Sequence, residues 1–320
     1  MRMIRSLTAL VLAAALFLSL PAGFCEGESP YSFVLENNQE YRTDLYPYVI
    51  HGESAWWYLS AADIEMMGLD AMCRSLDELT GDLEADFADA REALAPYLNE
   101  VPPVVICTDF SGHAQVSQTA SAYYNSLSNF IKVFHNWTSV KASLKHEYVH
   151  YLTFACAKVP ITSGFWAEGV AEYITRIAGQ SRLSRSVNMG LSEEETSFYR
   201  KKGAWDDEAD CLDERILYYA LAQLCIRGDA MGMPYYAVCN EMIDRTEKIQ
   251  QDPKPYQLSF YEAASMIAWL VEQYGEETVF ACWNLDAEKT EEYFGEPFSM
   301  LYAGWAEWNT RKCDELGLVF

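Results

Sequence analysis

The feature of this 320-residue sequence that most restricts its folding is the pentapeptide HEYVH at residues 146–150. Side chains four residues apart lie one turn above each other on an α-helix, so a helix here projects His146 and His150 from one face. The apolar residues around the motif indicate that this helix is buried; they are Leu144, Val149, Leu152 and Phe154. We therefore expect a buried helix over about residues 140–157.

Two histidines at this spacing can bind a single Zn²⁺ ion, and Glu147 between them can take a proton from water that the zinc acidifies. The same letters also occur by chance, on a surface helix with His146 solvated and His150 packed in the core. The chain has 5 histidines, and two of them fall in this motif. We therefore favour a zinc site with Glu147 as its catalytic base.

A catalytic zinc ion needs three protein ligands and one open position. No histidine follows His150, so the third ligand is either upstream or another residue type. A metzincin site would need glycine at position 153 and histidine at position 156, where this chain has Thr153 and Cys156. Glu168 is the better candidate, because two antiparallel helices joined by a short turn around Pro160 would bring it opposite the two histidines.

The segment FWAEGVAEY at residues 165–173 makes the pattern more specific. HEYVH followed by WAEGVAEY resembles the gluzincin zinc metallopeptidases, in particular the peptidase MA-like domain family. The resemblance covers residues 75–310 and implies a thermolysin-like zincin core with His146, His150 and Glu168 as zinc ligands. It also implies that Glu172 accepts a hydrogen bond from a ligand imidazole. The alternative for Glu172 is a solvated acid on a helix surface.

Hydrolysis of a peptide also needs a donor for the charge that develops on the carbonyl oxygen. Thermolysin-like enzymes place a histidine after the zinc site, and this chain has none there. Tyrosine is the other usual donor in gluzincins, and Tyr261 matches the downstream helix of the family best. Tyr261 could equally be a packing residue, and its rivals are Tyr218, Tyr219 and Tyr256. His51 and His113 receive no catalytic role.

The remaining periodicity predicts an α+β fold, in which a small mixed sheet carries the zinc helix on one side and a mostly helical C-terminal half closes the cleft. Apolar residues recur at helical spacing from Leu76 to Leu98. Residues 104–108 and 129–134 have the pattern of strands, and the second could lie at an edge. Residues 180–210 are polar and predict a long loop or lid. Further helices are expected at 163–178, 212–226, 234–243, 259–274, 276–283 and 297–313.

The N-terminus has the pattern of a secretory signal peptide, with Arg2 and Arg5 before an apolar stretch at residues 7–20. Cleavage after Ala22 or after Cys25 fits this pattern, and an N-terminal membrane anchor is the alternative. We divide the rest into a segment of unknown role, residues 26–72, and a peptidase domain, residues 73–320. That domain has an α+β half, residues 73–179, and a helical half, residues 180–320.

Export would make disulfides possible. The chain has 9 cysteines, and removal of Cys25 would leave an even number that could pair. The spacings are wide and no CxxC occurs, which fits buried unpaired thiols equally well and argues against a structural zinc site made of cysteines.

The formal charge of −24 repels nucleic acid and anionic lipid, so we expect neither as a partner. The expected partner is a peptide or protein substrate of a secreted zinc peptidase. The GxMEN segment with which gluzincin aminopeptidases hold a free amino terminus is absent, which favours an endopeptidase. The alternative function is an inactive secreted binding or surface protein that keeps the fold and a structural zinc ion; retention of Glu147 argues against it.

Overall fold

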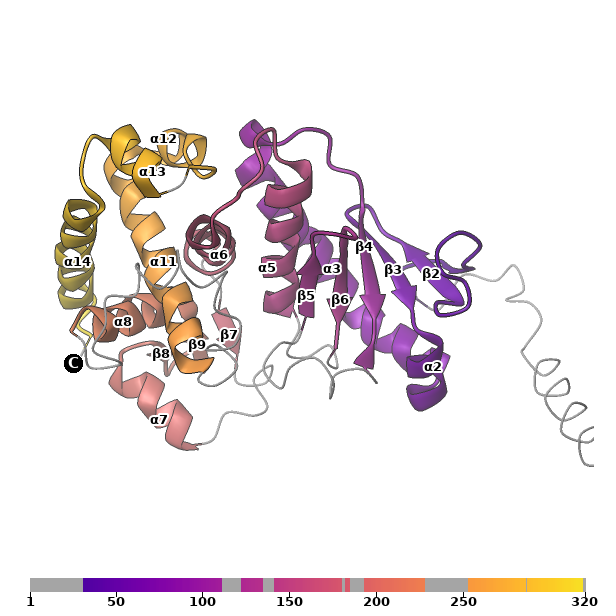
Figure 1. Cartoon of the computed structure of the whole chain (residues 1–320). Coiled ribbons are helices and arrows are strands. Elements are labelled where there is room, and N and C mark those ends of the chain that lie inside the picture. The colour runs from indigo at the N-terminus through magenta and orange to yellow at the C-terminus, as the bar shows by residue number, and fades with distance from the viewer. Residues whose placement is uncertain are drawn as a thin grey trace, which may run out of the picture.

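The computed structural model describes residues 31–110, 122–134, 141–179, 182–184, 193–227, 253–285 and 287–318. Its architecture is α+β, as expected, with a small mixed sheet followed by a mostly helical half (Figure 1). The predicted leader, residues 1–25, and the helix expected at 234–243 lie outside the described residues. Within the described ranges, no helix combines the length and the apolar character that a membrane crossing requires.

The larger sheet has six strands in the order β1-β2-β3-β4-β6-β5. The strands are β1 (Leu35–Asn37), β2 (Tyr48–His51), β3 (Ala55–Leu59), β4 (Val104–Thr108), β5 (Ala122–Asn125) and β6 (Phe130–Val133). The central strands β3, β4 and β6 are parallel, while β2 and β5 are antiparallel to their neighbours. β4 confirms the strand predicted at 104–108. The strand predicted at 129–134 is β6, which lies inside the sheet because β5 takes the edge.

The N-terminal segment, which the sequence left without a role, supplies half of this sheet. β3 pairs in parallel with β4, with Trp57 opposite Ile106, and both side chains are buried. The boundary expected at residue 73 falls inside helix α3 (Leu69–Leu94), so the structure does not divide the chain there. Strand β3 is buried on both faces and therefore lacks the alternation of apolar and polar residues that identifies a strand in a sequence.

Two long helices, α3 and α5 (Lys141–Tyr151), cover one face of the sheet. The short helix α2 (Ala61–Met67) precedes α3, and the 3₁₀ turn η1 (Ala95–Tyr97) follows it. Phe87 of α3 stacks on Tyr148 of α5, with ring centroids 4.2 Å apart. Leu144 and Val149 are buried in the same apolar core. Burial of these apolar side chains removes their surface from water, which favours the packed state. Helix α5 is therefore held against both α3 and the sheet.

The second half is built around the packing of α6 (Gly164–Glu172) on α11 (Pro253–Tyr274). Gly169 permits their close approach, because a Cβ atom there would lie 2.6 Å from Ile267 Cδ1. The other helices are α7 (Glu193–Lys201), α8 (Glu214–Ile226), α12 (Glu276–Ala281), α13 (Ala287–Phe294) and α14 (Phe298–Glu315). The helices predicted at 212–226, 259–274, 276–283 and 297–313 are confirmed as α8, α11, α12 and α14.

The segment predicted as a loop or lid contains regular structure. Besides α7, it supplies two strands, β7 and β8, of a three-stranded antiparallel sheet in the order β7-β9-β8, and β9 follows directly after it. The strands of this sheet are β7 (Arg182–Ser184), β8 (Trp205–Asp206) and β9 (Cys211–Asp213). These strands have only two or three residues each, which is too short for a sequence pattern to show.

Both helices that carry the motif residues continue as π-helical turns. The turn η4 (Leu152–Cys156) follows α5, and the turn η5 (Tyr173–Ala178) follows α6. With these turns included, the helices expected at 140–157 and 163–178 are confirmed. Such i→i+5 turns are rare and often accompany functional sites.

The seven described cysteines are free and buried, so they behave as core residues. They are Cys73, Cys107, Cys156, Cys211, Cys225, Cys282 and Cys313. Cys25 and Cys239 lie outside the described residues. Of the two expectations for cysteine, the described part of the chain follows the one without disulfides.

Candidate metal centre

The three ligands proposed from the sequence come together between α5 and α6. One ligand atom each from His146, His150 and Glu168 lies within 4.8 Å of the other two. Glu168 Oε2 is 3.3 Å from His146 Nε2 and 3.4 Å from His150 Nε2. Both imidazoles are buried, and Glu168 is partly exposed. The cluster thus presents two nitrogens and one oxygen to a common point.

The two helices do not meet in the way that the sequence suggested. Figure 1 shows α5 along its length and α6 end-on, so the helices cross rather than run antiparallel. The connection at residues 157–163 is fixed by the backbone pairing of Leu98 with Ala157. Packing of α6 on α11 then sets its direction, and no sequence pattern within the α5–α6 segment encodes that contact.

Glu147 lies beside the cluster and is held by the edge strand. Its Oε2 accepts a hydrogen bond of 2.6 Å from the backbone N–H of Tyr124 on β5. Burial raises the pKa of Glu147; Glu168 adds to this rise, while His146 and His150 oppose it. Sequence reasoning missed Tyr124, because a backbone donor leaves no signal in residue type.

Glu172 is buried, so the alternative of a solvated acid is wrong. Its Oε1 lies 3.0 Å from His146 Nδ1, which is an ion-pair distance without the geometry of a hydrogen bond, so the hydrogen bond that the resemblance implies stays a prediction. Its Oε2 accepts from the Tyr218 hydroxyl and lies 3.4 Å from Arg176 Nε. Burial alone would raise the pKa of Glu172, but His146 and Arg176 outweigh burial and lower the pKa to about 2.

The ligand residues shift each other's protonation in the absence of a metal ion. Burial would lower the pKa of His146, but Glu172 and Glu168 together raise it well above its ordinary value. Burial would raise the pKa of Glu168, but His150 and His146 hold it well below its usual range. The carboxylates therefore hold a proton on an imidazole that a metal ion would have to displace.

Arg176, in η5, links Glu172 to the start of α8. Its Nη1 lies 2.8 Å from Oε1 and 2.6 Å from Oε2 of Glu214, the first residue of α8. Burial opposes the charge of Arg176, but Glu214 together with Glu172 raises its pKa above the ordinary value. Arg176 follows Glu172 by four residues, a spacing that could have suggested an ion pair; Glu214 is 38 residues further on and gave no signal.

The candidate tyrosines occupy different environments. Tyr261 packs edge-on against Tyr218, with ring centroids 4.6 Å apart, so it lies next to the partner of Glu172. Tyr218 itself donates to Glu172. Tyr219 packs instead on Trp308 of α14, at 5.6 Å. The Tyr256 side chain lies outside the described residues, and Tyr261 as the oxyanion donor stays a prediction.

His51, one of the other histidines considered in the sequence, is not part of the cluster. His51 ends β2, pairs with Glu36 at 3.4 Å and packs against Trp56. His113 lies outside the described residues. The expectation that His51 has no catalytic role stays a prediction; its strand β2 lies on the side of the sheet away from β5.

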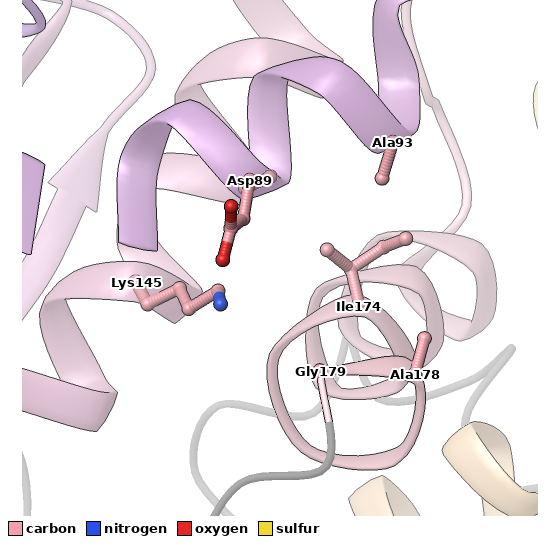
Figure 2. A pocket seen from close by; sticks show the side chains of 7 residues that line it. Asp89, Ala93, Lys145, Ile174, Ala178 and Gly179 are labelled. Atoms are coloured by element: carbon pink, nitrogen blue, oxygen red, sulfur yellow. The ribbon is translucent and has the colours of Figure 1, made fainter. Parts of the chain in front are cut away.

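A cavity of about 360 Å³ lies between α3, α5 and η5, apart from the cluster (Figure 2). Lys145 of α5 and Asp89 of α3 point toward one another across it. Lys145 Nζ also lies 3.4 Å from Asp86 Oδ1. None of the cavity's lining residues belongs to the His–His–Glu cluster, so this cavity is not the candidate reaction site.

Comparison of the chain with protein-family models, with curated proteins and with solved structures finds no match. The function is therefore argued from the geometry of the centre and from the motif.

Proposed function

We propose that this protein is a secreted zinc-dependent peptidase of the gluzincin type, with a thermolysin-like zincin core. The observation that carries this proposal is the position of Glu147. Its partly buried carboxylate adjoins two imidazoles and a carboxylate that converge on one point, and desolvation raises its pKa. A structural metal site has no need for such a base.

The donor set fits a zinc ion. Tetrahedral ligands at 2.0–2.1 Å from zinc lie about 3.3 Å from one another, and the distances from Glu168 to the two histidine nitrogens are 3.3 and 3.4 Å. The surroundings also favour a cation, because acidic groups gather around the cluster. Glu147 and Glu168 lie at the two histidines, and Glu172 and Glu214 share the single guanidinium of Arg176. When bound, the ion supplies Lewis acidity, which polarises a carbonyl oxygen and acidifies water.

The residues of the chain then have distinct tasks. Glu147 accepts a proton from the attacking water and passes it to the leaving amine, for which a raised pKa suits it. The Tyr124 N–H fixes the direction of that carboxylate. Glu172 holds His146 through Nδ1, so that Nε2 faces the cluster. Tyr261 is the proposed donor to the carbonyl oxygen.

A peptide substrate suits the surroundings of Glu147. β5 is at the end of the six-stranded sheet, and the Tyr124 N–H points away from β6 toward Glu147. An exposed strand edge is a template for an extended peptide, which pairs with it through backbone hydrogen bonds. The Phe154 ring stacks near Tyr124 at 6.3 Å and lies 5.8 Å from His150, which gives this side of the site an apolar wall. We favour endopeptidase action, because the GxMEN segment is absent.

The test compares wild type with Glu147→Gln in zinc content and in cleavage of a broad peptide library whose amino termini are acetylated. We expect one zinc per chain in both proteins and a loss of cleavage of about 10²–10⁴-fold in the variant. Equal cleavage by the two proteins would refute the peptidase proposal. Bound zinc without cleavage by wild type would favour the inactive binding protein. Cleavage of free but not acetylated peptides would indicate an aminopeptidase.

A further inference from the structure

The two oxygens of the Glu172 carboxylate have different partners. Oε1 lies 3.0 Å from His146 Nδ1. Oε2 is shared by the Tyr218 hydroxyl and by Arg176 Nε, the latter at 3.4 Å. A carboxylate whose second oxygen is held by two donors cannot rotate without breaking both contacts, so Oε1 stays directed at His146.

Arg176 is in turn held by Glu214. Two hydrogen bonds, of 2.8 and 2.6 Å, join its Nη1 to both oxygens of that carboxylate. The side chains of Arg176 and Glu214 are 12% and 7% exposed, so water does not screen the pair strongly. Asp213 caps α8 through the Ile216 N–H, at 3.3 Å, which fixes the turn from which Glu214 projects. A continuous series of hydrogen bonds and ion pairs therefore connects α8 to His146.

We propose that Arg176, held by Glu214, is a positioning residue for the zinc ligand His146. Its role is to fix the rotation of Glu172 and so the direction of the His146 ring, which makes the docking of α8 a condition for a fully formed zinc site. This inference rests on the proposed zinc function and names the part of the helical half on which that site depends.

The Arg176–Glu214 pair could instead have a purely structural role, in which it affects stability but not zinc affinity. A double substitution separates the positioning role from the structural one. Removal of one partner of a buried pair leaves an uncompensated charge, whereas replacement of both partners by apolar residues is often neutral for stability. We therefore compare Arg176→Met with the double variant Arg176→Met/Glu214→Leu. The full chain is used, and thermal unfolding of the metal-free protein is measured together with the zinc dissociation constant, by competition with a chromophoric chelator.

We expect the single variant to lose both stability and zinc affinity. In the double variant the metal-free midpoint should return toward wild type, while zinc stays bound about tenfold or more weakly, as is typical when partners of metal ligands are lost. The visible absorption of the cobalt(II) form should change as well, because the His146 ligand is no longer oriented. A double variant with wild-type zinc affinity and an unchanged cobalt spectrum would overturn the proposal.

Arg176→Lys decides the question if the double variant does not fold. Lysine keeps the charge next to Glu214, but its single ammonium cannot reproduce the bonds of a guanidinium to two carboxylates. Weaker zinc binding by Arg176→Lys supports the proposal, and unchanged affinity contradicts it. The matched control is Arg215→Met, because Arg215 is the second residue of the same helix and, among the described residues, forms its ion pair with Asp213, at 3.4 Å. Wild type that binds no zinc would instead refute the proposed function itself.

Discussion

The two ends of helix α8 carry two buried polar networks of opposite kind. At its start, Glu214 and Tyr218 belong to the charged network that leads through Glu172 to His146. Near its end, Gln223 accepts from Asn309 Nδ2 at 3.0 Å and donates to Thr310 Oγ1 at 3.0 Å. The second network is neutral and joins α8 to α14.

The difference lies in how each network is completed. In the amide network Asn309 also donates to the Tyr219 carbonyl at 3.1 Å, and its own Oδ1 has no hydrogen-bond partner among the described residues. The charged network sets the carboxylates of Glu168, Glu172 and Glu214 against Arg176 and the proton that His146 holds in the metal-free protein, so its carboxylates outnumber its cations by one. Buried polar groups therefore join two helices at one end of α8, and at the other end they surround the proposed metal site.

The largest effect on the charged network is expected from loss of a proposed zinc ligand. Glu168→Ala removes the oxygen that faces both imidazoles, so zinc affinity should fall by more than about 100-fold, the upper range for loss of a ligand's supporting residue. Zinc content after dialysis and peptide cleavage measure the effect. Zinc content equal to that of wild type would show that Glu168 is not the third ligand.

Acidity should act on the charged network in two opposite ways. The raised pKa of His146 in the metal-free protein means that zinc must displace a proton, so zinc affinity should fall by about tenfold per pH unit below that pKa. The stability that the metal-free protein gains from protonated His146 is fully present below the unfolded value of about 6.5 and is lost as pH rises through the folded pKa. Chelator competition and thermal unfolding from pH 6 to pH 9 should therefore show opposite slopes. Parallel slopes would contradict this.

The amide network should respond in stability alone. Asn309→Ala removes donors to the Tyr219 carbonyl and to Gln223, which should cost about 1 kcal/mol, because Cys313 and Thr310 still donate to these two acceptors. Urea unfolding measures this loss, and chelator competition should give the wild-type zinc affinity. A fall in zinc affinity as large as that of the Arg176 variants would show that the two networks are coupled along α8.

The smallest effect is expected on the surface of the same half. Arg311 and Glu307 of α14 form an exposed pair at 3.3 Å, and such pairs contribute little. Arg311→Gln should change the free energy of unfolding by less than about 0.5 kcal/mol. Zinc affinity and cleavage should match wild type, which makes this variant the baseline for the Glu168 and Asn309 variants.

The sequence predicted the parts of the fold that have local signals. The helical face around His146 and His150, the strand at 104–108 and the helix predicted at 212–226 all appear where periodicity indicated. Strands β1 to β3 were missed because short or fully buried strands lack alternation, and β5 because AYYN has no pattern of its own. Helix α13, also missed, has eight residues between short loops.

The candidate site likewise contains residues that the sequence predicted and residues that it did not. His146, Glu147 and His150 follow from one motif, and Glu168 and Glu172 from the segment that resembles a family. Tyr124, Glu214 and the Tyr218 contact to Glu172 come from other strands and helices, so only the packed chain brings them to the site. The crossing of α5 and α6 likewise depends on α11, far along the sequence.

The π-helical turns η4 and η5 bear on how insertions and deletions affect this centre. Each turn encloses one residue more than an α-helical turn, and one residue rotates the following chain by about 100°. A deletion within η4 would leave His146 and His150 unchanged but would redirect the approach to α6 and so move Glu168. A deletion within η5 would turn Arg176 away from Glu214. Sequences of the same fold should therefore tolerate length changes in the surface loops far better than at these two turns.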